Sequence, residues 1–155
     1  MPIHSSLSLV IDTNIWIYLH YSDLVAEAFV LGSLHVPDLM LTKELLTEPT
    51  WDGLRDKGAS FDELTSDNMR TVMQIKSMHK DVSVCDVACL ILSERMQVPL
   101  VTNDKDLRKL ASSRHARLHS FDDLLALMVR ADIISMNRQQ DAIGSLVAQG
   151  ERPPS

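Results

Sequence analysis

The chain has 155 residues, of which 45% are apolar and 23% are charged, which suits one globular domain with a buried core. No apolar run approaches the roughly 20 residues that span a bilayer. The N-terminus also lacks a basic segment followed by an apolar one, so we expect a cytoplasmic protein that does not enter a membrane. The formal net charge of −6 excludes docking on nucleic acid through a globally basic surface.

Two cysteines, Cys85 and Cys89, are four residues apart on a predicted helix. That spacing separates their Cβ atoms by roughly 5–6 Å, more than the roughly 3.8 Å of a disulfide. We therefore expect two free thiols in the core, as is usual in a reducing compartment.

Strands and helices are predicted to alternate along the chain. Short β-rich runs predict strands at residues 8–11, 34–41, 98–101 and 116–119. Apolar residues at helical spacing predict helices at residues 15–19, 24–31, 43–48, 61–80, 83–96, 105–111 and 121–131, with a loop or short helix at 51–58. This order is typical of a three-layer α/β/α domain around a parallel sheet of about four to five strands. We expect that domain to occupy residues 1–131. Residues 132–155 would form a polar C-terminal extension, partly helical and then disordered at its Gly, Pro and Ser-rich end.

Acidic side chains follow the predicted strands or begin the helix between them. Asp12 ends the first strand, Asp104 and Asp106 follow the strand at 98–101, and Asp86 lies in the first turn of the helix at 83–96. Each could simply cap a helix. Together, at the edge of one sheet, they would repel one another without a cation. Because Mg²⁺ and Mn²⁺ prefer oxygen ligands, the set predicts metal-assisted hydrolysis of a phosphodiester.

Basic residues follow the acidic loop, among them Lys105, Arg108 and Lys109. They form either a solvated helix face or a local rim that holds the phosphates of a substrate.

The ordered acidic motifs resemble those of the PIN-domain nucleases over roughly residues 7–125. Residues 10–16, Val-Ile-Asp-Thr-Asn-Ile-Trp, are similar to the opening motif of that family. Residues 85–92 resemble its third acidic motif, and residues 99–107 resemble its last.

The resemblance implies roles for individual residues. Asp12, Asp86 and Asp104 would be metal ligands and catalytic residues, with Asp106 near the metal and with Asn14 and Thr102 in support. The second acid of the family would be either Glu44 or Glu48. Of these, Glu48 is preferred as the catalytic residue because it follows a Leu-Leu pair, and Glu44 remains a candidate metal ligand.

The resemblance also implies an activity and partners. PIN domains of this compact size are commonly the toxins of toxin–antitoxin pairs, and they are often homodimers that cut structured RNA. We therefore expect a Mg²⁺- or Mn²⁺-dependent endoribonuclease with an RNA substrate and an antitoxin protein partner. A non-catalytic PIN-like module that binds RNA or protein is the alternative. A haloacid-dehalogenase-like phosphatase is disfavoured, because Asn14 stands where its second acid is needed.

Overall fold

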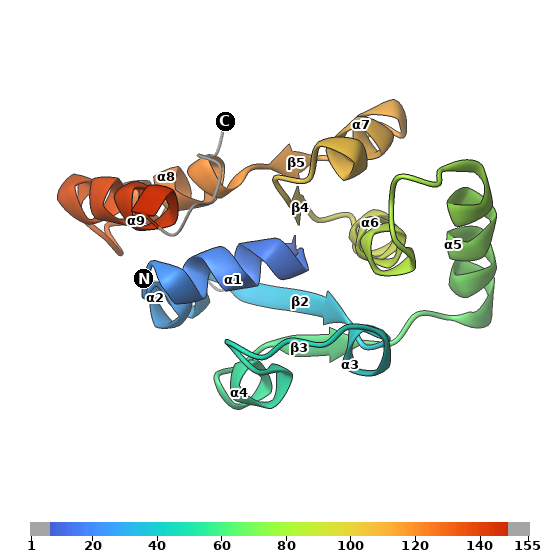
Figure 1. Cartoon of the computed structure of the whole chain (residues 1–155), viewed down its shortest axis with the longest axis horizontal. Coiled ribbons are helices and arrows are strands. Elements are labelled where there is room, and N and C mark those ends of the chain that lie inside the picture. Colours follow the sequence, from blue (N-terminus) through green and yellow to red (C-terminus); the bar gives the residue numbers. More distant parts are fainter. Residues whose placement is uncertain (1–6, 149–155) are drawn as a thin grey trace.

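A computed structural model describes residues 7–148, and at its centre is one parallel sheet of five strands in the order β3-β2-β1-β4-β5 (Figure 1). The strands are β1 (Ser8–Ile11), β2 (Ser33–Pro37), β3 (Ser60–Asp62), β4 (Leu100–Val101) and β5 (Leu118–His119). The central β1 is almost wholly buried, as expected of a strand covered on both faces. The predicted α/β class and strand number are confirmed.

The helices form two groups. They are α1 (Thr13–Tyr21), α2 (Val25–Leu31), α3 (Met40–Lys43), α4 (Trp51–Asp56), α5 (Ser66–Met78), α6 (Val84–Met96), α7 (Lys105–Ser113), α8 (Phe121–Arg130) and α9 (Met136–Ala148). Helices α1, α2, α8 and α9 pack together, whereas α6 contacts β1, β2, β4 and its neighbours α5 and α7 (Figure 1). The sheet lies between the groups, which gives the predicted three layers. No helix in the described part of the chain is long and apolar enough to cross a membrane.

The order of the strands reverses between β1 and β4. From β1 the chain proceeds to β2 and β3 on one side of the sheet, and then to β4 and β5 on the other. The β1–β4 register pairs Ile11 with Val101, so Asp12 and Thr102 follow neighbouring strands at the same level. In open α/β sheets, this reversal is where ligands bind, outside the carboxyl ends of the strands.

The segment after β2 differs from the prediction. The predicted strand at 34–41 ends at Pro37, and α3 follows it directly. The predicted helix at 43–48 is wrong, because Glu44 adopts an extended conformation with φ −123° and ψ 133° and ends α3.

One strand was missed. The three residues of β3 pair with β2 at the sheet edge, too short a run for alternation to reveal. The predicted helix at 61–80 therefore begins later, at Ser66, after a capping box formed by Thr65 and Asn68.

The predicted C-terminal extension contains α9, which packs against α1 and α8. Its Ala142 and Leu146 are fully buried. Arg138 Nη2 donates to the carbonyl oxygens of Ser22 at 2.7 Å and Asp23 at 3.0 Å, just beyond the end of α1. The described part of the extension is thus docked on the same body, and the end predicted to be disordered lies outside the described residues.

Candidate active site

Asp12 is a buried carboxylate at the end of β1, with only 3% of its surface exposed. It caps α1, because its Oδ1 accepts from the backbone nitrogen of Thr13 at 2.8 Å. Its Oδ2 accepts from the hydroxyl of Thr102 at 2.7 Å. Burial, with the charges of Asp86 and Asp104 adding to it, raises the pKa of Asp12 to about 7. Near neutral pH this carboxyl therefore sits at its titration point instead of being fully ionised.

Asp104 caps α7 and is connected to Asp12 through Thr102. Its Oδ1 accepts from the backbone nitrogen of Leu107 at 2.9 Å. Its own backbone nitrogen donates to the Thr102 hydroxyl at 3.0 Å. Thr102 is fully buried, so one hydroxyl fixes the relative positions of the two acids, as the predicted supporting role requires.

Asp86 lies in the first turn of α6 as part of a capping box. Its Oδ2 accepts from the backbone nitrogen of Ser83 at 3.1 Å, and the Ser83 hydroxyl accepts from the Asp86 nitrogen at 3.0 Å. Burial raises the pKa of Asp86, and the nearby charges of Asp104 and Glu44 act in the same direction.

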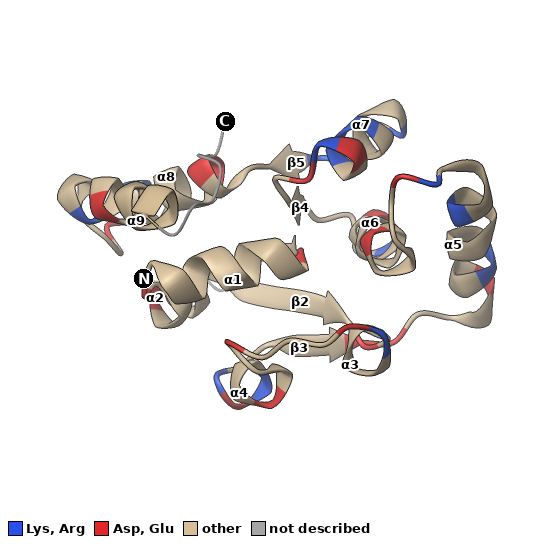
Figure 2. Ribbon diagram, viewed as in Figure 1, with Lys and Arg blue, Asp and Glu red and all other residues tan. Residues whose placement is uncertain are grey.

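Glu44 completes a cluster of four carboxylates, hereafter the acidic cluster, made of Asp12, Glu44, Asp86 and Asp104. The hydroxyl of Thr13, next to Asp12, donates to Glu44 Oε1 at 2.5 Å. Burial raises the pKa of the Cys85 thiol to about 12, and the adjacent Glu44 charge contributes. Because the chain is extended at Glu44, this side chain reaches the first turn of α1. Figure 2 shows acidic residues at the starts of α1, α6 and α7.

The structure separates Glu48 from this cluster. Glu48 is 70% exposed, with Oε2 at 3.9 Å from His20 Nε2, and it lines a different cavity with Pro49, Thr50 and Lys57. The preference for Glu48 assumed one continuous helix carrying both glutamates on one face. That helix is absent, so the geometry favours Glu44.

Two further predicted residues are exposed to solvent. Asn14 lies in the first turn of α1, and Asp106 lies in the first turn of α7. Asp106 lines a cavity between α7 and the segment after α5. It is two residues away from Asp104 in sequence, but it faces this neighbouring cavity.

The predicted basic rim is only partly free to bind a substrate. Lys105 and Lys109 are exposed. Arg108 is half-buried, and its Nη1 donates to the backbone oxygen of Thr102 at 2.8 Å. Arg108 therefore braces the loop that carries the acidic cluster.

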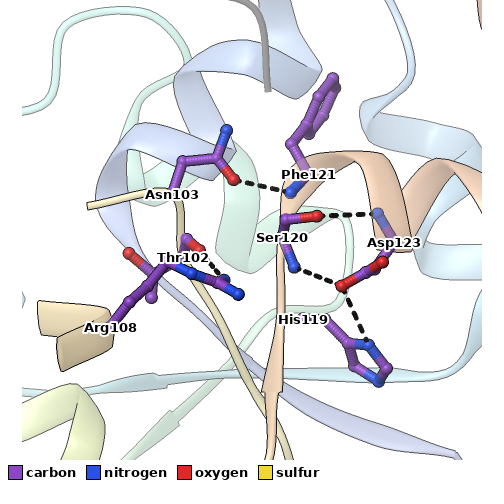
Figure 3. Close-up of polar contacts among 7 residues, drawn as sticks. All are labelled: Thr102, Asn103, Arg108, His119, Ser120, Phe121 and Asp123. Atoms are coloured by element: carbon purple, nitrogen blue, oxygen red, sulfur yellow. Dashed lines mark hydrogen bonds and ion pairs between the residues drawn. The ribbon is translucent and has the colours of Figure 1, made fainter. Parts of the chain in front are cut away.

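Sequence reasoning missed two residues that hold this region in place. One is Thr13, through its bond to Glu44. The other is Asn103, whose Oδ1 accepts from the backbone nitrogen of Phe121 at 2.8 Å and so fastens the β4–α7 loop to the start of α8 (Figure 3). Ser120 and Asp123 form the capping box of that helix, and His119 Nδ1 is 3.8 Å from Asp123 Oδ2. The bonds of Thr13 and Asn103 join segments that only the fold brings together, so no local sequence signal marks them.

The acidic cluster fits a hydrated divalent cation by the chemistry of its donors. Among residues 7–148, no three His, Cys, Asp or Glu side chains are grouped closely enough to enclose an ion. Mg²⁺ does not need such a cage, because it keeps several waters and is commonly bound through one or two carboxylates plus substrate phosphates. The helix caps use one oxygen of Asp86 and one of Asp104, which leaves the second oxygen of each for a cation. The raised pKa values of Asp12 and Asp86 show that the cluster holds uncompensated negative charge.

The sequence was also compared with known proteins. No protein-family model matches it, and a search of curated proteins finds no relative. The resemblance to PIN domains therefore rests on the motifs.

Proposed function

We propose that this protein is a divalent-metal-dependent endoribonuclease that hydrolyses phosphodiester bonds at the acidic cluster. One observation carries the proposal. Four carboxylates from separate parts of the chain gather at the strand reversal of a parallel sheet, and the most buried of them, Asp12, has a pKa raised to about 7 by burial and by its acidic neighbours. Such a group of acids is unfavourable alone and is relieved by a cation.

Each residue contributes a separate function in this proposal. Asp86 and Asp104 would hold Mg²⁺ or Mn²⁺ through the oxygens that their caps leave free, and Asp12 would join them once deprotonated. When bound, the ion polarises the phosphoryl group and lowers the pKa of a bound water. Glu44 is half-buried and held by Thr13, so it is placed to accept a proton from an attacking water at its Oε2. Thr102 keeps Asp12 from rotating away.

The narrower proposal concerns biological role. On the motif resemblance, we infer a cytoplasmic, homodimeric toxin that cuts structured RNA and is blocked by an antitoxin protein. The single-stranded loops of that RNA would be the targets, because there the bases can be splayed and the backbone can reach the acids.

The direct test is cleavage of a pool of tRNA and rRNA fragments by purified protein in Mg²⁺, Mn²⁺ or EDTA. Asp86→Asn is the test variant, and Asp141→Asn, an exposed acid on α9, is the matched control. The proposal predicts metal-dependent cutting that only Asp86→Asn loses. RNA binding without cutting, in protein stripped of any inhibitor, would instead support the non-catalytic module.

The toxin role has its own test. Induced expression in bacteria should arrest growth, and Asp86→Asn should relieve the arrest. Normal growth with active nuclease present would contradict the toxin role while leaving the enzyme intact.

A further inference from the structure

A second hollow adjoins the acidic cluster, and the proposed chemistry does not use it. This hollow, hereafter the α5–α7 cavity, has a volume of about 380 Å³. One wall is residues 78–82, from the end of α5 to the residue before the cap of α6. The other is the face of α7 that carries Asp106, Lys109, Leu110 and Ser113. Its volume falls within the roughly 300–1,000 Å³ typical of small-molecule sites.

Both walls lead directly into the acidic cluster. Val82 immediately precedes Ser83, whose capping box holds Asp86. Asp106 is two residues beyond Asp104, the cap of α7. A chain of phosphates with one member at the acidic cluster would therefore bring a neighbouring nucleotide to this cavity. Figure 2 shows charged residues on the α5–α6 connection and on α7, the two segments that form these walls.

The lining suits one nucleotide better than a bare anion. Lys80 and Lys109 supply two positive charges, and Asp81 and Asp106 balance them when His79 is neutral. At the acidic cluster itself a phosphate chain meets net negative charge, but here it meets none. Exposed Met78, with buried Val82 and Leu110, offers apolar contact to a base. The lysines and the Ser113 hydroxyl are donors for phosphate and ribose oxygens.

We propose that the α5–α7 cavity binds one unstacked nucleotide of the RNA strand next to the scissile phosphate. Lys80 and Lys109 contact its flanking phosphates, and Met78 contacts its base. This inference rests on the proposed function for the position of the scissile phosphate. Recognition of an unstacked nucleotide requires single-stranded RNA, since a base within a duplex cannot enter the cavity.

The test separates binding from cleavage. Fluorescence anisotropy measures the Kd of a labelled single-stranded oligoribonucleotide in EDTA, in an Asp86→Asn background that cannot cut. Lys80→Gln combined with Lys109→Gln is the test variant. Lys57→Gln, an exposed lysine just beyond α4, is the control with the same type of charge change. Each binding curve is repeated over a range of salt concentrations.

The expected result is specific to phosphate contacts. The double variant should weaken binding about tenfold near 0.1 M salt, and it should reduce the slope of log K against log salt by about 1.4, which is roughly 0.7 per lost contact on a single strand. Met78→Ala should weaken binding about threefold with the slope unchanged, since base contacts carry no counterion release. A duplex RNA should show neither loss.

Two outcomes would overturn the inference. The first is a double variant that binds single-stranded RNA as Lys57→Gln does. The second is an equal loss on duplex RNA, which would indicate general attraction to phosphate. If the protein shows these lysine effects yet never cuts RNA, the cavity stands and the nuclease proposal fails.

Discussion

The hydroxyl of Thr102 donates to Asp12 Oδ2 across 2.7 Å and accepts from the backbone nitrogen of Asp104 at 3.0 Å. The first bond joins residues 90 apart in sequence, and the second joins residues two apart. The hydroxyl thus fastens the end of β1 to the loop after β4, at the reversal of strand order.

Replacing Thr102 with Val should destabilise the protein by roughly 1–3 kcal/mol, because a buried carboxyl and a buried amide lose their shared partner. Urea unfolding measures this loss. The hydrogen bond from Thr102 lowers the pKa of Asp12, so Thr102→Val should also raise that pKa, as read from the carboxyl carbon shift in NMR. Thr102→Ser keeps the hydroxyl and should change both quantities much less. A stable Thr102→Val protein with an unchanged Asp12 titration would argue against this coupling.

Asp12 should make stability depend on pH in a predictable direction. Its pKa is 3.8 ordinarily and about 7 in the folded protein. Between these values the folded state keeps a proton that the unfolded state has lost, so the contribution of Asp12 to stability falls as pH rises through this window. Asp12→Asn removes the contribution. In EDTA, its advantage over the wild type should therefore grow by about 1–3 kcal/mol between pH 5 and pH 8.

Urea unfolding of both proteins at the two pH values measures this change, with Asp141→Asn as the control. Asp86 has a pKa shifted in the same direction, so the Asp12→Asn variant should keep part of the slope. An advantage of the same size at pH 5 and pH 8 would mean that Asp12 is not the titrating group.

Divalent metal should stabilise the folded protein more at high pH than at low pH, since protons compete with the ion for Asp12 and Asp86. At a Mg²⁺ concentration about 100 times Kd, the expected gain at pH 8 is about 2.7 kcal/mol. Thermal unfolding in Mg²⁺ and in NaCl of equal ionic strength separates binding from screening. Asp86→Asn should lose most of the gain. An identical Tm in the two salts would contradict a metal site.

Glu44 and Glu48 provide a matched pair for activity. Glu44→Gln should lower RNA cleavage at least about a hundredfold, the lower range for loss of a general base, because the side chain is held at the acidic cluster by Thr13. Glu48 is exposed near His20, so Glu48→Gln should cleave within about twofold of the wild type. Single-turnover cleavage on one RNA measures both. The reverse pattern would return the proposed role to Glu48.

Local sequence signals were sufficient where the responsible interactions are local. The capping boxes beginning at Ser83 and Ser120 involve residues three apart, and the structure confirms both. The acids at Asp12 and Asp104 cap their helices as the simpler interpretation predicted. Capping and gathering into one cluster turn out to be compatible, because each helix begins at the same edge of the sheet.

The sequence by itself therefore determined the α/β class, the parallel sheet, the strand ends where acids accumulate and most helix starts, since these depend on hydrophobic period and on contacts a few residues apart. Only the tertiary structure decided which glutamate joins Asp12. That choice depends on where α3 ends and on a bond between Thr13 and Glu44, 31 residues apart. The three-residue β3 likewise exists because β2 supplies its hydrogen-bonding partner. Contacts between distant segments leave no periodic trace in the chain, so they become visible only once the sheet has brought the segments together.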